Sequence, residues 1–506
     1  MLRSVVEYYS EHSGYSCGYC KSPDSNFSHG MWAHAMSVTD YQDLIDRGWR
    51  RSGKYCYKPT MEVTCCPMYT IRCRALEFKP TKSQKKILKR FNKYLTGQDL
   101  RQAADRDRKM STCSSGTDEE QITDGREHFV ESTKACQDID VDAVLSSDMI
   151  EEPAIMNEDN VSTVASSGES SQAKIPNSTP NLPKPTEKIK EIGKDLGPDP
   201  NKPPCKKAKQ LRLQRKLEKM KEKGIDVSNL PKTCRDQEKQ VEDFINELPS
   251  EVKHKLEIRL VRTSPASTEW LATSKETHEV YVKYQTVIHG DKPEKVTEPK
   301  FKEFLVQSPL LEEHSDSGPA CGYGSFHQQY WLDGKLIAVG VIDILPRCVS
   351  SVYFFYDPQY MNLTLGTYGA LREIQFTREL HKTCPELKYY YMGYYIHSCR
   401  KMRYKGNFSP SDLLCPETYK WFPIKDCIPK LEASKYARLD PDLDSTDDNY
   451  PAESDLNYVP VWTSGAVMFY KIYRRRSLKR SDDRDEVMEY ARLVGTKSAK
   501  SIILFR

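Results

Sequence analysis

The sequence predicts an α+β protein whose C-terminal half contains a mixed β-sheet. Two observations indicate this fold class. Strand-like and helical patterns follow one another between residues 240 and 476 in an order typical of such a sheet. The composition also changes sharply in the middle of the chain, so an N-terminal and a C-terminal folded part are expected on either side of a segment poor in core residues.

The C-terminal part, 240–476, is expected to be the main domain. Its strand-like runs lie at 281–287, 336–344, 351–356 and 388–396. A helix is expected at 368–381, and Gly366 and Thr367 open it. Strand, strand, turn, helix, strand is the order expected of a mixed α/β or α+β sheet. The remaining residues, 477–506, form a charged tail that is expected to be peripheral.

The N-terminal part, 1–98, is rich in aromatic, cysteine and turn residues, and a compact, irregular cysteine-rich module is expected there. Near its end Ile87, Phe91 and Leu95 recur at helical spacing, which predicts an amphipathic helix over 80–95. The other faces of this helix carry seven bases and no acid: Lys79, Lys82, Lys85, Lys86, Lys89, Arg90 and Lys93.

The middle of the chain differs from both parts. Residues 118–159 contain fourteen acids against two bases, and a run rich in proline and serine follows. Such a segment buries too little apolar surface to offset chain entropy, so 99–203 is expected to be a disordered linker. A basic helix and connector are expected at 204–239, because 206–223 holds nine bases and two acids.

Overall composition limits the class of protein. The chain has 506 residues, 38% of them hydrophobic, and a net charge of +4. It contains no apolar run of 18 residues, and its first residues lead into Glu7-Tyr8-Tyr9 rather than an apolar signal core. A soluble intracellular protein without a membrane partner is expected, located in the cytoplasm and the nucleus.

Two cysteine pairs are candidate metal ligands. Cys17 and Cys20 are separated by two residues, so both can reach one ion from a tight turn. Cys65 and Cys66 form a second pair, and the proline after them resembles cluster-binding loops more than a zinc knuckle. Four thiolates suit zinc or an iron–sulfur cluster equally. Buried thiols without a metal and a redox dithiol are the alternatives, and the spare ligands are Cys56, Cys73, His29 and His34.

Basic clusters indicate a polyanionic partner. They lie at 79–93, at 206–223 and at 471–480. Each alone also fits a solvated face, and 203–209 fits a nuclear import signal. Together, beside folded parts, they favour a partner of RNA size.

Five tyrosines between 389 and 395 fit either core packing or stacking on a terminal adenine.

Several long motifs resemble eukaryotic arginyl-tRNA–protein transferases. The longest is Asp-Tyr-Gln-Asp-Leu-Ile-Asp-Arg-Gly-Trp-Arg-Arg-Ser-Gly at 40–53. The others are the Cys-Gly-Tyr-Cys motif at 17–20 and the runs at 65–72, 324–330, 337–346, 350–358 and 404–406. The resemblance covers about 10–95 and 240–475 and leaves the linker unmatched.

This resemblance implies a specific reaction. Members of the family move arginine from Arg-tRNA to proteins that begin with Asp, Glu or oxidised Cys, and so mark them for ubiquitin-dependent degradation in the N-degron pathway. Their C-terminal part is similar to the acetyltransferase (GNAT) fold, with aminoacyl-tRNA in place of acetyl-CoA. Iron–sulfur or other metal binding is implied for Cys17, Cys20, Cys65 and Cys66. The implied partners are tRNA(Arg) and acceptor proteins with acidic N-termini, and a monomer is expected.

The implied chemistry requires orientation of an amine, removal of a proton and stabilisation of an oxyanion, but no covalent enzyme intermediate. The acceptor amine has a reference pKa near 8, so part of it is already neutral at pH 7. In an acetyltransferase-like fold the donor carbonyl lies where two central strands splay, and 351–356, which begins at Ser351, is the candidate strand.

Candidate catalytic side chains surround this strand. Asp343 interrupts an apolar strand, and the guanidinium of the transferred arginine is a natural partner; a structural salt bridge is the alternative. His327, Tyr330 and Tyr353 are candidates for a general base or proton relay.

Substrate contacts are expected from cations and from the helix start. Arg72, Arg74, Lys401 and Arg403 are candidates for the pocket of the acidic acceptor residue. Gly366 and Thr367 are candidates for a tRNA phosphate site, with a simple helix start as the alternative. Contacts to the tRNA body are expected from Lys82, Lys85, Lys86, Lys89, Arg90, Arg212, Arg215 and Lys216.

Two other functions fit parts of the pattern. One is a non-enzymatic RNA-binding or metal- and redox-sensing protein whose acetyltransferase-like core is inactive. The other is a CoA-dependent acetyltransferase, which the incomplete glycine loop at Gly366 disfavours.

Overall fold

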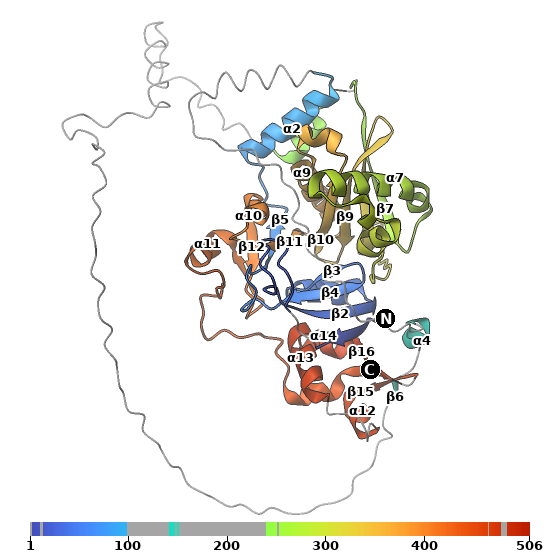
Figure 1. The fold of residues 1–506 in the computed structure, drawn as a ribbon, viewed down its shortest axis with the longest axis vertical. Helices are drawn as coiled ribbons and strands as arrows, with labels where there is room; N and C mark the ends of the chain where they lie inside the picture. The colour runs from blue at the N-terminus through green and yellow to red at the C-terminus, as the bar shows by residue number, and fades with distance from the viewer. Residues whose placement is uncertain are drawn as a thin grey trace, which may run out of the picture. The chain divides into compact units, whose positions relative to one another are not determined.

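A computed structural model describes residues 3–10, 14–98, 141–146, 149–150, 239–249, 252–463, 465–476 and 483–506 (Figure 1). The described residues up to 150 and from 239 onward belong to one compact unit. The predicted basic helix at 206–223, with Arg212, Arg215 and Lys216, lies outside the described residues, as does most of the predicted linker. No described helix combines the length and the apolar character needed to cross a bilayer.

A mixed sheet of eight described strands forms the centre of the unit. Its order is β13 (Trp421–Pro423), β12 (Ser411–Leu414), β5 (Tyr69–Arg74), β11 (Tyr389–Tyr395), β10 (Cys348–Tyr356), β9 (Lys335–Ile344), β8 (Gly324–Leu332) and β7 (Leu256–Ser264). Strands β7 to β10 are antiparallel neighbours, whereas β10 and β11 run parallel. The predicted α+β class with a mixed sheet is confirmed.

Two long helices cover opposite faces of this sheet. On one face Tyr281 of α7 (Thr268–Tyr284) packs on Phe355 of β10, with ring centroids 5.4 Å apart. On the other face α9 (Leu365–His381) approaches Phe354 so closely that a Cβ added at Gly369 would lie 2.3 Å from the ring. Neighbouring residues of a strand point to opposite faces, so Phe354 and Phe355 anchor the two helices on the two sides.

The parallel strands β10 and β11 stay paired for a short distance only. Their register joins Cys348 to Tyr389 and ends at Ser350 and Tyr391. Beyond that point the pairing of each strand with its other neighbour shifts in register. The shift lies between Ser351 and Tyr353 where β10 pairs with β9, and between Tyr391 and Tyr394 where β11 pairs with β5. Bulges bend a strand and end local pairing. The two strands therefore part in the middle of the sheet.

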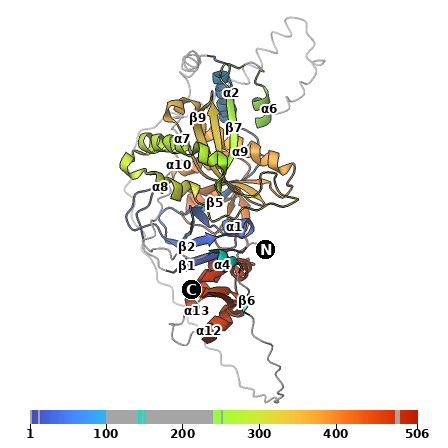
Figure 2. The ribbon, with the colours of Figure 1, turned by 90° about the vertical axis from the view of Figure 1, so that its right-hand side faces the viewer.

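A second sheet joins the two ends of the chain. Its order is β3 (Arg50–Ser52), β4 (Tyr55–Pro59), β2 (Ser28–Ala35), β1 (Val5–Tyr9), β16 (Ile503–Phe505), β14 (Pro460–Thr463), β15 (Ala466–Phe469) and β6 (Met149–Ile150). Strand β1 pairs with β16, so the blue N-terminal strands lie beside the red C-terminal elements in both views (Figures 1 and 2).

The remaining helices are shorter or lie at the periphery of the sheets. They are α1 (Val38–Ile45), α2 (Lys82–Leu95), α4 (Val141–Ser146), α6 (Val241–Asn246), η2 (Gln285–His289), η3 (Pro293–Lys295), α8 (Glu298–Phe301), η4 (Lys302–Val306), η5 (Pro358–Leu363), α10 (Arg400–Arg403), η6 (Tyr404–Asn407), α11 (Ile424–Ala433), η7 (Glu453–Tyr458), α12 (Tyr470–Arg476), α13 (Arg484–Val494) and α14 (Thr496–Ser501).

The expected division into separate modules differs from the structure. Strand β5 comes from the N-terminal part, yet it lies between β11 and β12 of the C-terminal part. Its residues Tyr69 and Ile71 are almost completely buried there, and their burial stabilises the joint sheet. The segments 1–98 and 240–476 therefore share one core.

The expectation that 477–506 is a peripheral tail is wrong. Val487, Tyr490 and Val494 of α13 are fully buried, because they form an apolar stripe beneath the charged residues of the presumed tail 477–506. Within the predicted disordered linker, β6 pairs with β15 through Met149 and Val467.

The helices predicted at 80–95 and 368–381 are confirmed, but one predicted strand is wrong. Helix α2 begins after a capping box at Thr81 and buries Leu88, Phe91 and Leu95. The β-branched and aromatic residues at 281–287 predicted a strand, but they belong to α7 and to the π-helix η2. Their apolar side chains pack at helical spacing against the sheet, so tertiary packing overrides their strand propensity.

Candidate active site and cysteine cluster

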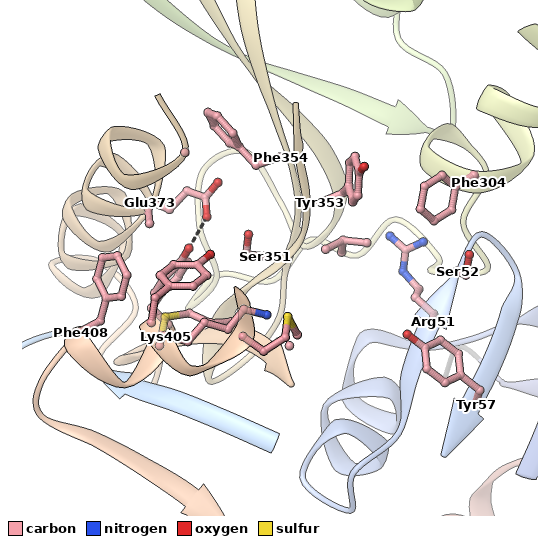
Figure 3. A pocket seen from close by; sticks show the side chains of 18 of the residues that line it. Arg51, Ser52, Tyr57, Phe304, Ser351, Tyr353, Phe354, Glu373, Lys405 and Phe408 are labelled. Atoms are coloured by element: carbon pink, nitrogen blue, oxygen red, sulfur yellow. Dashed lines mark hydrogen bonds between the residues drawn. The ribbon is translucent and has the colours of Figure 1, made fainter. Parts of the chain in front are cut away.

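A cleft opens where β10 and β11 part (Figure 3). It encloses about 1200 Å³, including space open to solvent. Its lining comes from both ends of the chain and comprises Tyr15, Ser28, Arg51, Ser52, Tyr55, Tyr57, Tyr284, Phe304, Ser351, Val352, Tyr353, Phe354, Tyr356, Gly366, Ala370, Glu373, Tyr390, Met392, Gly393, Met402, Tyr404, Lys405 and Phe408. Figure 3 shows Ser351 between two ends, with Glu373 and Phe408 on one side and Arg51 and Tyr57 on the other.

Helix α9 forms the wall of the first end. Gly366, Ala370 and Glu373 follow one another at spacings of four and three residues, so they share one helix face. Glu373 is 1% exposed and accepts a 2.5 Å hydrogen bond at Oε2 from the Tyr390 hydroxyl. This end of the cleft is an aromatic pocket with a buried carboxylate.

The second end lies between β3–β4 and the α7 side of the sheet. Tyr353 lines it, and its hydroxyl accepts a hydrogen bond of 2.9 Å from Gln285 Nε2 and lies 3.5 Å from His289 Nε2. Gln285 and His289 belong to the π-helix η2, a rare element that is frequent at functional sites. Ser351 and Tyr353 are thus the two predicted catalytic residues that line the cleft.

The prediction for Asp343 is corrected by its surroundings. Its carboxylate is completely buried, and Arg51 binds it through Nε at 2.8 Å and Nη2 at 2.6 Å. Ser325 Oγ donates a further hydrogen bond of 2.7 Å. The carboxylate has a partner from the protein and does not line the cleft, so the structural salt bridge is the interpretation that fits.

His327 and Tyr330 also lie outside the cleft. His327 is completely buried and donates from Nε2 to the Leu305 carbonyl at 2.9 Å, and burial lowers its pKa to about 4. The Tyr330 hydroxyl donates to Gln328 at 2.6 Å, and burial raises its pKa well above the usual value. Neither side chain lines the cleft, so their predicted roles as base or relay are corrected.

Most predicted substrate contacts lie elsewhere. Gly366 lines the cleft, whereas the neighbouring Thr367 is buried and does not. Arg72 and Arg74 both form ion pairs with Asp412, and neither belongs to the lining. On the segment that carries Lys401 and Arg403, the residues that line the cleft are Met402, Tyr404, Lys405 and Phe408.

Sequence reasoning missed three charged residues of the cleft: Arg51, Glu373 and Lys405. Arg51 lies in the motif at 40–53, but the pattern does not distinguish it from Arg50. Glu373 has a usable signal, because it shares a helix face with Gly366 and Ala370, which are small enough to border a cavity.

The four cysteines chosen from the sequence converge. The Sγ atoms of Cys17, Cys20, Cys65 and Cys66 lie within 4.8 Å of one another, and those of Cys20 and Cys65 are 3.4 Å apart. A tetrahedral ion with Zn–S bonds of about 2.3 Å spaces its thiolates about 3.8 Å apart. The thiols therefore fit a four-coordinate metal.

The protonation properties of the cluster are uneven. A backbone hydrogen bond from Ser22 lowers the pKa of Cys20 to about 7, whereas burial raises the pKa of Cys65 and Cys66. A thiolate at Cys20 supplies a first anionic ligand near neutral pH.

The basic helix α2 lies at the start of α9. Arg90 donates from Nη1 to the Thr364 hydroxyl at 3.2 Å and to the Asn362 carbonyl at 3.3 Å. Phe91 stacks on Tyr368, with ring centroids 3.9 Å apart. Lys82, Lys86, Lys89 and Lys93 are exposed on the opposite side of the helix. The predicted tRNA-binding helix therefore adjoins the predicted phosphate turn.

Comparison with known proteins identifies the family. A family profile described as arginine-tRNA-protein transferase, N terminus, matches residues 15–86, and one described as arginine-tRNA-protein transferase, C terminus, matches residues 276–415. These ranges contain all four clustered cysteines and the whole lining of the cleft.

Two relatives that match most of the chain have names that agree with these profiles. The chain is 42% identical to arginyl-tRNA–protein transferase 1 of Drosophila melanogaster over 99% of both chains. It is 38% identical to arginyl-tRNA–protein transferase 1 of Arabidopsis thaliana over 84% of this chain and 74% of the relative. A shorter match of 85 residues, 35% identical, links 17% of this chain to 34% of an aspartate/glutamate leucyltransferase of Campylobacter jejuni. The chain therefore belongs to the arginyl-tRNA–protein transferase family.

Proposed function

We propose that the protein transfers arginine from arginyl-tRNA to the α-amino group of acceptor proteins in the cleft where β10 and β11 part. The acceptors proposed are proteins that begin with Asp, Glu or oxidised Cys. The observation that supports this site is the passage of the cleft between the two strands. A donor on the α9 side and an acceptor on the β3–β4 side can meet there at Ser351. The non-enzymatic alternative has no support from the comparisons.

The order of the elements supports a GNAT-like fold for the C-terminal part. Strand β7 is followed by α7 and α8, then by the antiparallel strands β8, β9 and β10, then by α9 and the parallel strand β11. The parting of two parallel central strands, with a helix after the first, is the arrangement expected of an acetyltransferase-like site. In this proposal the aminoacyl end of tRNA takes the place of the acyl-CoA.

The reaction itself needs few protein groups. The amine nitrogen attacks the ester carbonyl, a C–N bond forms, the bond to the ribose oxygen breaks, and the proton lost by the amine is balanced by one gained by the ribose oxygen. After Ser350, β10 is no longer paired with β11, so backbone N–H groups on this edge of β10 are available. We propose that they donate hydrogen bonds to the oxygen of the ester carbonyl. We assign the proton relay to Tyr353, whose hydroxyl is held by Gln285 and lies near His289.

The tRNA is proposed to approach along α2. The exposed Lys82, Lys86, Lys89 and Lys93 recur at spacings of four, three and four residues, which places them in one stripe. Arg90 lies beside the start of α9, where the helix N-terminus favours a phosphate. The acceptor stem is thus directed toward the cleft.

The acidic first residue of the acceptor requires a cation in the cleft. Among the described lining residues the cations are Arg51 and Lys405. The guanidinium of Arg51 is bound to Asp343, whereas Lys405 Nζ donates to the Tyr394 carbonyl at 3.0 Å and points toward the centre of the cleft (Figure 3). An ammonium has three donors, so Lys405 is our candidate for the acceptor carboxylate.

The cysteine cluster is proposed to hold an iron–sulfur cluster or zinc. The sulfur spacing supports one tetrahedral ion, since a cluster attaches its thiolates to different irons and spreads them farther apart. A metal held by these thiols would stabilise the turn at 17–25, which positions Tyr15 and Ser28 at the cleft through the Tyr15–Asn26 bridge.

The biological setting remains a proposal as well. We place the protein in the cytoplasm and the nucleus, as a monomer that marks proteins for ubiquitin-dependent degradation. Imaging of a fluorescent fusion with and without the basic run at 203–209 tests the location, and loss of the nuclear signal in the truncated fusion is expected.

A direct assay tests the function. The purified chain is incubated with tRNA(Arg) charged with radiolabelled arginine and a peptide that begins with Asp, with the N-acetylated peptide as the matched control. Label is expected in the free peptide only, and only with charged tRNA. A folded protein that binds tRNA but labels neither peptide contradicts the proposal.

A further inference from the structure

The cleft needs a group that distinguishes arginine from other amino acids. An arginine side chain carries an apolar stem and a planar cation with five N–H donors. A selective pocket therefore combines an apolar or aromatic wall with a carboxylate at its end. Asp343, the carboxylate expected for this role, is bound to Arg51 and lies outside the lining.

Glu373 lies in such a pocket. It is the only carboxylate among the described residues that line the cleft, and its side chain is 1% exposed. Figure 3 shows it on the α9 side, the end that also contains Phe354 and Phe408. An acidic side chain of the acceptor needs a positive charge, whereas Glu373 gives this end of the cleft a negative one.

The surroundings fix the position of the Glu373 carboxylate. Tyr390 donates to Oε2 at 2.5 Å. A Cβ added at Gly340 would lie 2.6 Å from Oε1, so the glycine leaves space for the carboxylate on the surface of the sheet. The neighbouring Arg372 is directed to the Tyr368 hydroxyl at 3.1 Å. A carboxylate accepts about four hydrogen bonds, so the bond from Tyr390 is compatible with a further donor.

Tyr390 also links Glu373 to the point of reaction. Burial and the charge of Glu373 raise the pKa of Tyr390 well above its usual value, so its hydroxyl stays protonated and donates to Glu373. Ser351, Tyr390 and Glu373 all line the same cleft, and Figure 3 shows Ser351 between the Glu373 end and the Arg51 end. An arginine whose ester lies at Ser351 can therefore reach Glu373 with its guanidinium.

We propose that Glu373 binds the guanidinium of the arginine carried by the tRNA and so determines which amino acid is transferred, with Tyr390 as the residue that positions its carboxylate. This inference rests on the proposed function of the cleft. It assigns the α9 end to the donor side chain and leaves the β3–β4 end to the acceptor.

The test compares two amino acids on the same tRNA. The tRNA(Arg) body is charged chemically with arginine or with citrulline, whose neutral urea group replaces the guanidinium at nearly the same size. Transfer to a peptide that begins with Asp is measured as kcat/KM for the wild-type chain and for Glu373→Gln. The matched control is Glu379→Gln, which removes a charge from an exposed position of the same helix.

The wild-type chain is expected to prefer arginine by about 100-fold or more, because a site built for a charged hydrogen bond rejects an analogue that lacks it. Glu373→Gln is expected to remove most of this preference by lowering arginine transfer while citrulline transfer stays within about threefold. Glu379→Gln is expected to keep the wild-type ratio. A KM effect confined to charged tRNA is expected for Tyr390→Phe, with a smaller loss of preference.

Other outcomes overturn the inference. An unchanged arginine-to-citrulline ratio in a folded Glu373→Gln protein contradicts it, as does an equal loss with both amino acids. If thermal unfolding shows that Glu373→Gln does not fold, the same comparison is made with Glu373→Asp. An unchanged arginine-to-citrulline ratio together with unchanged arginine transfer in that variant contradicts guanidinium binding by Glu373. A wild-type chain that transfers neither amino acid overturns the proposed function itself, and the inference with it.

Discussion

The guanidinium of Arg51 and the carboxylate of Asp343 form a fully buried pair held by two hydrogen bonds, at 2.8 and 2.6 Å. Arg51 belongs to β3 of the second sheet and Asp343 to β9 of the central sheet. The pair therefore joins the N-terminal part to the C-terminal part directly beside the cleft. A residue that the sequence presents as catalytic contributes instead to the joint between the parts that form the site.

Removal of one partner of this pair is expected to be strongly destabilising. Asp343→Asn leaves the Arg51 charge buried without its counterion, which costs about 3–5 kcal/mol of unfolding free energy. Urea denaturation followed by tryptophan fluorescence measures the loss. The control is Glu298→Gln in the exposed pair with Lys302, for which a change below about 0.5 kcal/mol is expected. Equal stability of both variants contradicts a structural role for the pair.

Metal binding is expected to depend on all four clustered cysteines. Substitution of Cys17 or Cys66 by Ser removes a ligand, so metal content measured by elemental analysis is expected to fall from about one site per chain to near zero. The control is Cys384→Ser, a buried thiol outside the cluster, which should keep the wild-type content. An absorption band at about 400 nm after anaerobic purification, which charge transfer in an iron–sulfur cluster produces, distinguishes such a cluster from colourless zinc. Wild-type metal content in Cys17→Ser would exclude this ligand set.

The lysine stripe of α2 is expected to contribute to tRNA affinity. Lys86→Glu together with Lys89→Glu should weaken binding about tenfold or more and reduce the slope of log K against log salt by about one per lost phosphate contact. Filter binding at several salt concentrations gives both quantities. Lys275→Glu, at an exposed position of α7, is the matched charge reversal. If it weakens binding as much as the double variant, the effect is only one of net charge.

The stability of the fold is expected to fall in mild acid through His327. Burial lowers its folded-state pKa to about 4 from the ordinary value of 6.5. Between these two pH values His327 binds a proton in the unfolded chain but not in the folded chain. The free energy of unfolding therefore rises with pH in this range, and the folded state becomes less stable as the pH falls toward 4. The full effect is on the order of 3 kcal/mol. Denaturation at pH 7 and pH 5 should show a weaker pH dependence for His327→Gln than for the exposed control His314→Gln, and identical slopes would argue against it.

The sequence predicted the parts of the fold whose signals are local. The CxxC spacing and the Cys65-Cys66 pair led to four thiols that do converge. The helical pattern at 368–381 and the strand at 351–356 led to α9 and to the splayed β10. Each of these signals depends on neighbouring residues, so one sequence carries it.

The remaining errors arise from contacts between distant residues. Nothing near Asp343 shows that Arg51, 292 positions away, neutralises it. Whether a strand residue such as Tyr330 faces a cleft or the core depends on register and on bulges, which a single sequence does not reveal. Strand β5 joins the central sheet only because β11 and β12 fold beside it, so its position could not be assigned from residues 69–74 alone.

The placement of the reaction centre can be tested most directly by a structure of the chain bound to tRNA(Arg) that carries arginine through a non-hydrolysable amide at its 3′ end. The arginyl carbonyl is predicted to lie between β10 and β11 within hydrogen-bonding distance of the β10 backbone near Ser351, with the terminal phosphates at the start of α9. A terminal adenosine and arginine bound outside the cleft lined by Ser351 and Gly366 would contradict this placement.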